Sequence, residues 1–325
     1  MPETKKILVK DAHAFIPAFT KGKTSEKLTE DDELPYGCQI MGAAKLHKEG
    51  KKGKGVRVAV IDSGVDAEHP AFDGMVKYQA WFRWGTPLEE DDHGTHVAGT
   101  IHNMAPEAEI YDYRVFGGEG AFEIDDAIVT SIFEACYDGC DIINMSLGGR
   151  WPSANILTAV QYAHSQGVIV VCAAGNSGDD DPLTNERGFP AMWEEAISVA
   201  ASSKKGKTPV AFFSNTNPHI DYAGIGVDVV SMKPGGSFQE MSGTSMACPH
   251  VAGLIAAVLH DAIKGRGFGS AHKPNDTKVR AFLNKKCAID IGVEGPDNAS
   301  GIGFLSYLDK GEFDALMEKV EEAAT

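Results

Sequence analysis

The sequence predicts an α/β fold: a mostly parallel central sheet with helices on both faces, three layers in a single domain. Three observations predict this fold. Short apolar segments of strand length alternate with segments of helical length and character, as in βαβ units. Each apolar segment ends in small or polar residues, as buried parallel strands do at a sheet edge. No internal repeat or second linker divides the 325 residues, so one large domain is expected.

The first predicted strand, 56–61, is an apolar run that ends in Asp62 and so places a carboxylate at the sheet edge. Further strands are expected at 110–116, 141–145, 168–174, 197–200 and 227–232. Helices are expected at 40–47, 93–102, 124–137, 153–166, 277–286 and 310–324. The Leu-Pro-Tyr-Gly segment at 34–37 predicts a turn before the first of these helices.

The composition excludes several classes of partner. Lys and Arg number 30 against 46 for Asp and Glu, and the net charge of −16 argues against nucleic acid, which needs a basic face. The charged first ten residues do not resemble a secretory signal, and no apolar run has the length of a membrane span. With six sparse cysteines, we expect free thiols in a reducing compartment and a cytoplasmic protein without a membrane partner.

The N-terminal segment differs in composition from the rest of the chain. Residues 1–32 are mostly polar, with one apolar island at 14–19 that Pro17 prevents from forming a regular helix. The charged stretch 21–32 predicts an exposed linker. We therefore expect an N-terminal extension, 1–32, and a folded domain, 33–325.

Ser245 lies where a small, glycine-containing turn at 243–250 leads into the apolar helical run 251–259. A serine in the first turn of a helix lies beside unpaired backbone N–H groups and the positive end of the helix dipole, which stabilise developing negative charge. The alternative is that Ser245 is only a helix N-cap. Residues elsewhere in the chain decide between the two.

Three further residues supply what a serine nucleophile needs. Asp62 ends the first strand and His93 opens a helix, so they are candidates for the orienting carboxylate and the base. Asn176 follows a strand and is a candidate donor to an oxyanion. Each alone also fits a structural role, as a cap, a packed histidine or a turn residue. Their joint occurrence is what indicates acyl transfer.

The motifs around these residues resemble the subtilisin-like serine proteases. The matching segments, in that family's order, are VIDSGVD at 60–66, HGTHVAGT at 93–100, SLGG at 146–149, AAGN at 173–176 and GTSMACPH at 243–250. The resemblance extends from about residue 34 to the C-terminal helices. It implies a subtilisin-like three-layer fold and a serine endopeptidase that hydrolyses peptide bonds through an acyl-enzyme.

The resemblance also implies roles for individual residues. Ser245 would be the nucleophile, His93 the base, Asp62 its orienting group, and Asn176 with the Ser245 N–H the oxyanion hole. His96 is a rival base, but the family pattern assigns that role to the first histidine. Substrate would bind as an added strand between two edges. The residues implied at those edges and in the S1 pocket are Ser146, Leu147, Gly148, Gly149, Gly188, Ala121, Phe122 and Glu123.

The resemblance leaves specificity and cations partly open. The glycines suggest an open S1 pocket with Ser177 near its rim and a broad or apolar P1 preference, although Asp179, Asp180 and Asp181 leave room for a basic one. Phe189–Pro190 matches a position where the family has a cis peptide bond. No cofactor is needed for the chemistry. The helix from His93 runs on where secreted relatives have a calcium loop, so we expect that site to be absent, while a weaker calcium or sodium site at 188–195 stays open.

The N-terminal extension resembles that of the intracellular subtilisin branch, in which a short segment blocks the active site until it is cut. Its apolar-Ile-Pro-aromatic element is similar, though not identical, to Phe15-Ile16-Pro17-Ala18-Phe19 here, so Phe15, Ile16 and Pro17 are the candidate inhibitory residues and the chain's own extension is an expected partner besides polypeptide substrates. The alternative is a tail that touches nothing. Two other functions stay open on this fold, a transpeptidase or macrocyclase and a catalytically silent peptide-binding protein. Whether the chain forms a homo-oligomer is also open.

Overall fold

The computed structural model describes most of the chain. The described residues are 15–16, 19–29, 34–85, 88–120, 122–203, 210–263 and 276–323. Within them, nine strands form a central sheet in the order β13-β14-β10-β9-β8-β7-β2-β5-β3, parallel throughout except for the β13–β14 pair. These strands are β2 (Arg57–Asp62), β3 (Val76–Trp81), β5 (Glu109–Arg114), β7 (Ile142–Met145), β8 (Ile169–Ala173), β9 (Ala196–Ser202), β10 (Tyr222–Ile225), β13 (Ala288–Ile289) and β14 (Phe304–Leu305).

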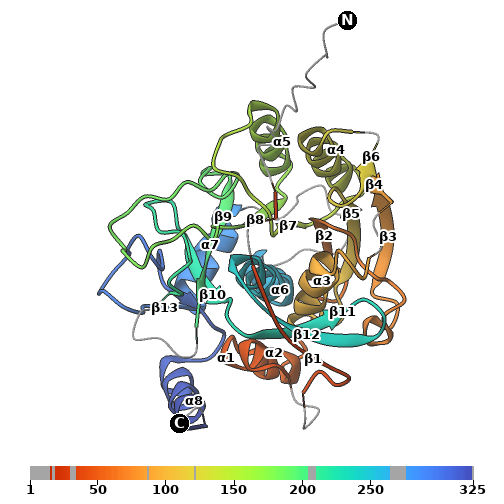
Figure 1. The fold of residues 1–325 in the computed structure, drawn as a ribbon. Coiled ribbons are helices and arrows are strands. Elements are labelled where there is room, and N and C mark those ends of the chain that lie inside the picture. Colours follow the sequence, from red (N-terminus) through yellow and green to blue (C-terminus); the bar gives the residue numbers. More distant parts are fainter. Residues whose placement is uncertain are drawn as a thin grey trace, which may run out of the picture.

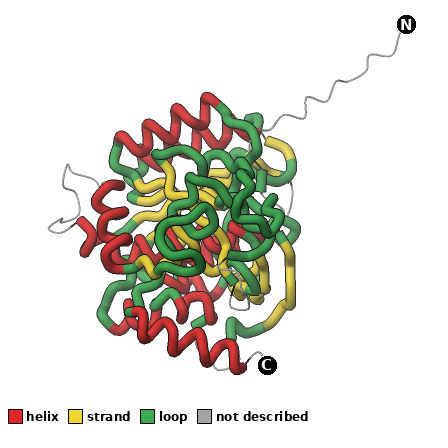
Figure 2. The backbone as a smooth tube through the Cα atoms, turned by 90° about the vertical axis from the view of Figure 1, so that its left-hand side faces the viewer, coloured by secondary structure: helices red, strands yellow, loops and turns green. Residues whose placement is uncertain are grey.

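Helices cover both faces of the sheet and separate the core into two layers (Figure 1). One face is covered by α4 (Ile124–Tyr137) and α5 (Ala154–Ser165), which pack on each other. The other face is covered by α3 (His93–Met104) and α6 (Thr244–Ile263), with α7 (Asp276–Lys286) against α6. Seen from the side, strands lie between helices, and loops cover much of that side (Figure 2). The predicted three-layer α/β/α fold in one domain is confirmed.

The α6 helix explains why one long apolar run lies at the centre of the molecule. Its residues from Met246 to Leu259 are almost all fully buried, and it contacts β7, β8, β9 and β10 as well as α3. A helix that is apolar all round is stable only where it is enclosed on all sides. This central position holds the N-terminus of α6 beneath the carboxyl edge of the sheet.

The predicted helix at 40–47 is wrong in its bounds. The chain forms α1 (Tyr36–Ile40), which begins at the expected turn, and α2 (Ala43–Lys48), with a break at Gly42. Gly42 has a φ of 86°, and a Cβ added there would lie 3.0 Å from the Tyr307 Cβ. Tight packing against a distant segment therefore bends the chain where local pattern favours continuity. The C-terminal helix α8 (Lys310–Ala323) then packs near α1.

A second, antiparallel sheet contains two segments that the sequence placed otherwise. The strand expected at 227–232 is β11 (Val229–Lys233), which pairs with β12 (Ser237–Ser242) outside the parallel sheet. The stretch 21–32, expected to be a linker, contributes to β1 (Thr20–Ser25), which pairs with β12. All six residues of β1 are exposed, so backbone pairing holds it and no apolar alternation marks it in the sequence.

Two short elements complete the described chain. A 3₁₀ turn, η1 (Pro70–Phe72), follows the loop after β2, and a two-stranded antiparallel pair joins β4 (Arg83–Trp84) to β6 (Glu119–Gly120). Figure 1 shows β4 and β6 beside the N-terminal part of α4. This pair lies between the strand β3 and the helix α4, at the edge of the sheet where β2 and β5 end.

Candidate active site

The four residues predicted for catalysis stand at the ends of separate elements. Asp62 is the last residue of β2, His93 the first of α3, Asn176 follows β8, and Ser245 is the second residue of α6. Parallel strands deliver their carboxyl ends to one edge of a sheet, and helix N-termini return to that edge. The fold therefore brings these four segments to the same edge.

Asp62 and His93 form a buried pair. The His93 Nδ1 lies 2.7 Å from the Asp62 Oδ1, which also accepts the Ser63 N–H at 2.7 Å. Both side chains are almost fully buried, and the His93 Nε2 has no hydrogen-bond partner among the described residues. The carboxylate thus fixes the orientation of the imidazole and leaves its second nitrogen available.

The Ser245 hydroxyl is turned toward the end of β7. Its Oγ donates to the Ser146 carbonyl at 3.1 Å, and no hydrogen bond joins it to His93 in the described structure. The Ser245 side chain has a single torsion, about its Cα–Cβ bond, and rotation to another staggered position would turn Oγ away from the Ser146 carbonyl. Catalytic hydrogen bonds are often formed only when substrate is bound, so this orientation leaves the predicted role of Ser245 open.

A proline inside α6 gives Ser146 a second contact with Ser245. Pro249 has no N–H to bond to the carbonyl four residues earlier, which belongs to Ser245. The Ser146 Oγ donates to that carbonyl at 2.9 Å, and the Asn144 Nδ2 donates to the Ser146 Oγ at 3.1 Å. Asn144 of β7 and Ser146, just after β7, thus replace the missing helical hydrogen bond and support the first turn of α6.

Asn176 is oriented by the residue before Ser245. Its Oδ1 accepts the backbone N–H of Thr244 at 2.8 Å and the Thr244 hydroxyl at 2.7 Å. The amide nitrogen therefore points the other way, and a Cβ added at Gly243 would lie 3.1 Å from it. Asn176 can direct N–H groups at the space beside the N-terminus of α6, as an oxyanion donor requires.

His96, the rival base, is held elsewhere. Its Nε2 lies 3.0 Å from the carbonyl oxygens of both Val229 and Gln239, which belong to β11 and β12. Burial, reinforced by the nearby His93, lowers the pKa of His96 to about 3. A fully buried, neutral histidine bonded to two carbonyls serves packing between α3 and the antiparallel sheet.

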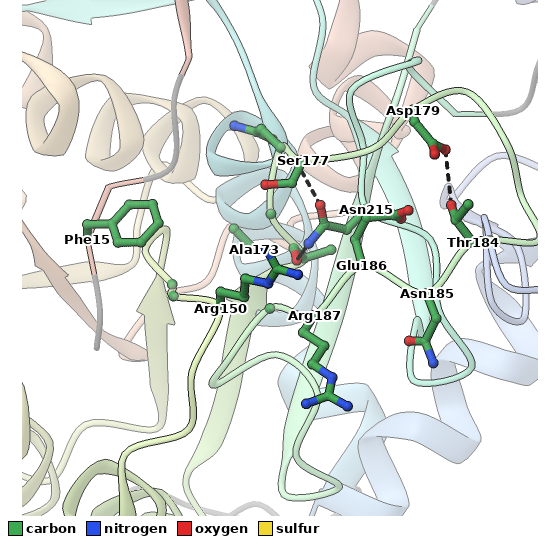
Figure 3. Close-up of a pocket in the computed structure, with 16 residues that line it drawn as sticks. Phe15, Arg150, Ala173, Ser177, Asp179, Thr184, Asn185, Glu186, Arg187 and Asn215 are labelled. Atoms are coloured by element: carbon green, nitrogen blue, oxygen red, sulfur yellow. Dashed lines mark hydrogen bonds between the residues drawn. The ribbon is translucent and has the colours of Figure 1, made fainter. Parts of the chain in front are cut away.

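A cavity of about 450 Å³ opens beside this edge, at the predicted S1 pocket (Figure 3). Backbone from Gly148, Gly149 and Gly188 lines it, with Ser177 and Asp179 also present, as expected. Gly188 is required by a close approach, because a Cβ there would lie 2.2 Å from the Ala174 carbonyl oxygen. The Phe189–Pro190 peptide bond that follows it is cis, as expected from the resemblance.

Two carboxylates and two arginines line the cavity, and of these the sequence analysis had named only Asp179. Asp179 accepts the Thr184 hydroxyl at 3.0 Å, and Glu186 accepts the Thr216 N–H at 2.8 Å, so each carboxylate has a partner. Arg150 and Arg187 also line the cavity, and both are exposed. Asp180 and Asp181 do not line it.

In the segment 146–149, Gly148 is the residue whose backbone N–H and carbonyl bond to the N-terminal extension. The Leu147 side chain is in the core, Ser146 bonds to Ser245, and Gly149 pairs with Phe189 through two hydrogen bonds of 2.8 Å. Gly148 instead pairs with Phe15, with N–O distances of 2.8 and 2.9 Å. Of the other predicted edge, Phe122 is partly exposed and Glu123 precedes α4, while Ala121 lies outside the described residues.

The N-terminal extension crosses the candidate site. Phe15 pairs with Gly148 and lines the cavity, and Ile16 packs on the core layer beneath α4 and α5; Pro17 lies outside the described residues. The Phe19 ring lies over the His93 ring, with centroids 4.8 Å apart. The Lys21 Nζ then pairs with Asp92 at 2.7 Å. The contact of Phe19 with His93 and that of Lys21 with Asp92 were not anticipated, because no local pattern reveals which residues a crossing segment will cover.

Metal ligands and membrane spans were also sought among the described residues. They contain no group of three or more His, Cys, Asp or Glu side chains suited to a metal ion. None of the described helices has both the length and the apolar character needed to cross a membrane. The described cysteines are all buried, and none forms a disulfide.

Comparison with known proteins agrees with the fold and with the motifs at its edge. Residues 53–303 match the model of the Subtilase family. The "Major intracellular serine protease" of Bacillus subtilis (strain 168) is 34% identical over 316 residues, 92% of this chain and 95% of that protein. The "Intracellular serine protease" of Paenibacillus polymyxa is 37% identical over 70% of this chain and 73% of its own length. "Subtilisin E" of Bacillus subtilis (strain 168) is 38% identical over 70% of this chain and 61% of its own.

Proposed function

The chain belongs to the subtilase family of serine proteases, and we propose that it hydrolyses peptide bonds with Ser245, His93 and Asp62 as its catalytic triad. The observation that carries the proposal is the buried Asp62–His93 pair, which orients an imidazole whose Nε2 makes no hydrogen bond to a described residue. His96 and His250 also have one ring nitrogen without a partner among the described residues, but each bonds to backbone carbonyls, whereas His93 bonds to a buried carboxylate.

The proposed reaction has two half-reactions, acylation of Ser245 and hydrolysis of the acyl-enzyme. The Ser245 hydroxyl leaves the Ser146 carbonyl, gives its proton to the His93 Nε2 and attacks the peptide carbonyl carbon. Asp62 stabilises the imidazolium, and His93 passes the proton to the leaving amine. Water then attacks the acyl-enzyme, with His93 again as the base. Asn176 and the Ser245 N–H stabilise the oxyanion of each tetrahedral intermediate.

We propose that substrate adds as a strand between Gly148 and the segment at Phe122 and Glu123. Support comes from the extension itself, because Phe15 already pairs with Gly148 in antiparallel fashion. The S1 cavity has three glycines in its lining, Gly148, Gly149 and Gly188, and its volume of about 450 Å³ leaves space for a large side chain. Because Arg150 and Arg187 line the same cavity as the two carboxylates, its charge is balanced, and an apolar P1 residue is favoured over a strictly basic one.

We further propose that residues 1–32 inhibit the domain formed by residues 33–325. The extension occupies the proposed substrate edge through Phe15 and covers the proposed base through Phe19. A Cβ added at Gly243, two residues before Ser245, would lie 3.2 Å from the Phe19 Cβ. Phe19 thus lies between His93 and the serine turn, where substrate would have to enter.

The names of two relatives suggest where the enzyme acts. Both the Bacillus subtilis and the Paenibacillus polymyxa proteins are named intracellular serine proteases, and the first aligns over nearly the whole chain. We therefore place this chain in the intracellular branch of the family, with cytoplasmic polypeptides as its substrates.

Labelling with a fluorophosphonate tests the mechanism and the inhibition together. The full chain, Ser245→Ala and a chain that starts at Glu33 are compared at equal concentration. We expect label on the full chain, faster labelling of the shortened chain and none on Ser245→Ala. Label on Ser245→Ala, or no label on any form, contradicts the triad and favours a silent peptide-binding protein. Equal rates for full and shortened chains contradict the inhibition. Transfer of the acyl group to an added amine in preference to water would identify a transpeptidase.

A further inference from the structure

All three guanidinium nitrogens of Arg83 donate hydrogen bonds to backbone carbonyls of one loop, residues 117–122. Its Nη2 donates to the Gly118 carbonyl at 2.8 Å, its Nη1 to the Phe122 carbonyl at 2.9 Å and its Nε to the Gly117 carbonyl at 3.4 Å. No carboxylate of the described residues forms an ion pair with Arg83. Its charge is therefore directed at backbone carbonyls, which accept stronger hydrogen bonds from a cation than from a neutral donor.

The loop that Arg83 holds leads to one of the two proposed substrate edges. It turns sharply at Gly117 and Gly118, which have φ values of 86° and 51°, and it reaches Phe122 and Glu123 just before α4. A sharp turn through two such glycines has little rigidity of its own, because glycine restricts the backbone least. The position of this edge relative to Gly148 must therefore be set by contacts from outside the loop.

The surroundings of Arg83 supply those contacts. Arg83 and Trp84 of β4 pair with Gly120 and Glu119 of β6, beside α4 in Figure 1. A Cβ added at Gly120 would lie 2.4 Å from the Arg83 Cδ, so the side chain passes directly across the loop backbone. The ring of the preceding residue, Phe82, packs edge-on against that of Phe122 at 5.7 Å.

We propose that Arg83 is a positioning residue for substrate residues on the N-terminal side of P1, and that it fixes the edge at Phe122 and Glu123 opposite Gly148. The proposal rests on the proposed protease function. A planar fork can bond three diverging carbonyls at once, whereas a lysine ammonium is a point charge and cannot reach all three in a fixed geometry. Arg83 touches no reacting group, so its effect depends on how much of the peptide lies along the edge.

The test compares two substrates in the full chain and in Arg83→Met. One is an acylated tetrapeptide and the other an acylated single residue, with the same P1 residue and leaving group. Because inhibition by the extension lowers both rates equally, the ratio of the two kcat/KM values is independent of the fraction of open sites. We expect this ratio to fall about tenfold in Arg83→Met, mainly through KM for the tetrapeptide, since loosely held edges lose alignment.

Two further variants make the outcome decisive. Arg57→Met is the matched control, because Arg57 also bonds a loop carbonyl, that of Asp138 at 3.0 Å, but at the start of β2, far along the strand from Asp62. Its ratio should match that of the unsubstituted chain. Arg83→Lys should behave as Arg83→Met does. An unchanged ratio in Arg83→Met, or a ratio restored by lysine, overturns the proposal. Absence of turnover of both substrates by the unsubstituted chain and also by the chain that starts at Glu33 would instead refute the protease function.

Discussion

The ring of Phe19 lies over the imidazole of His93, with centroids 4.8 Å apart and ring planes inclined at 49°. This contact joins a residue of the extension to the residue proposed as the base. It also explains why His93 is almost fully buried in a chain whose site must admit a peptide. The N-terminal extension is thus in contact with a group proposed for the chemistry, as well as with the edge proposed to bind substrate.

Replacing Phe19 by alanine should raise the activity of the full chain. Loss of the aromatic contact weakens the extension's hold by about 1 kcal/mol, which corresponds to about a fivefold rise in the open fraction. The initial rate of tetrapeptide hydrolysis measures this change. Phe133→Ala, on the outer face of α4, is the control and should leave the rate unchanged. A rate for Phe19→Ala no greater than that of the control would contradict the inhibitory role.

The Lys21–Asp92 pair should make the inhibition sensitive to salt. Asp92 immediately precedes His93 and is buried, whereas Lys21 is 42% exposed, so solvent ions can screen the pair. We expect the full chain's activity to rise about twofold between about 0.05 and about 0.5 M salt. Lys21→Met should be more active at low salt and respond less. Lys23→Met, on the same strand, should keep the salt response; its loss there would argue for a general effect of charge.

Ser146→Ala should lower kcat with little change in KM. The substitution leaves the Ser245 carbonyl, which Pro249 already deprives of its helical partner, without its 2.9 Å donor. A buried unsatisfied group costs about 1–3 kcal/mol, and the first turn of α6 should shift as a result. Ser306→Ala is the control, because the Ser306 hydroxyl also donates to a buried carbonyl, that of Ile40 at 2.6 Å. Similar loss of stability in both variants, with equal kcat, would show that Ser146 is only structural.

Asn176→Asp should lower kcat by about 10²–10³-fold, a magnitude typical of losing one oxyanion donor and for which subtilisin itself is the standard example. Aspartate keeps an oxygen for the Thr244 N–H and hydroxyl but removes the amide N–H groups. KM should change little, because the oxyanion forms only after substrate has bound. Steady-state kinetics on a peptide anilide measure the effect. Loss confined to KM would assign Asn176 to substrate binding instead.

The stability of the folded chain should fall as the pH drops below about 6.5. Burial lowers the pKa of His96 to about 3 and that of His250 to about 4, whereas each titrates near 6.5 when unfolded. Their stabilisation is therefore present above about pH 6.5 and is lost at about 1.4 kcal/mol per pH unit each below it. Asp112 acts in the opposite sense, because burial raises its pKa to about 6 and its protonation favours the folded state. Burial also lowers the pKa of His102 to about 4, so three histidines outweigh Asp112 and Asp221, whose pKa burial likewise raises, and a net loss remains.

His250→Gln isolates one of these contributions. The free energy of unfolding in urea is compared at about pH 7 and about pH 5 for both proteins. The variant should lose about 2 kcal/mol less than the unsubstituted chain over this interval. Equal losses would mean that His250 is protonated in the folded protein at about pH 5.

The sequence predicted the layers of the fold and named the candidate site residues, but it did not predict the antiparallel pairing outside the parallel sheet. The strands at β2, β5, β7, β8 and β9 and the helices α3, α4 and α5 lie within a few residues of their expected bounds. Apolar runs and capping signals act over neighbouring residues, so they are readable without a structure. The strand β1 was missed because its exposed side chains carry no periodic signal and its partner, β12, lies more than 200 residues away.

The sequence by itself determined which chemical groups stand at the ends of which elements. Asp62 ends an element that local pattern specifies, Asn176 follows one, and His93 and Ser245 each lie at the start of one. Only the tertiary structure decided how these groups are oriented and covered. The Ser245 hydroxyl bonds to Ser146, Phe19 covers His93, and Arg83 holds the loop at Phe122. Such contacts join segments that are distant in the chain. They depend on the order of the strands, on the space that a glycine leaves and on the hydrogen bond that a proline cannot make, and local sequence does not encode which segments will meet there.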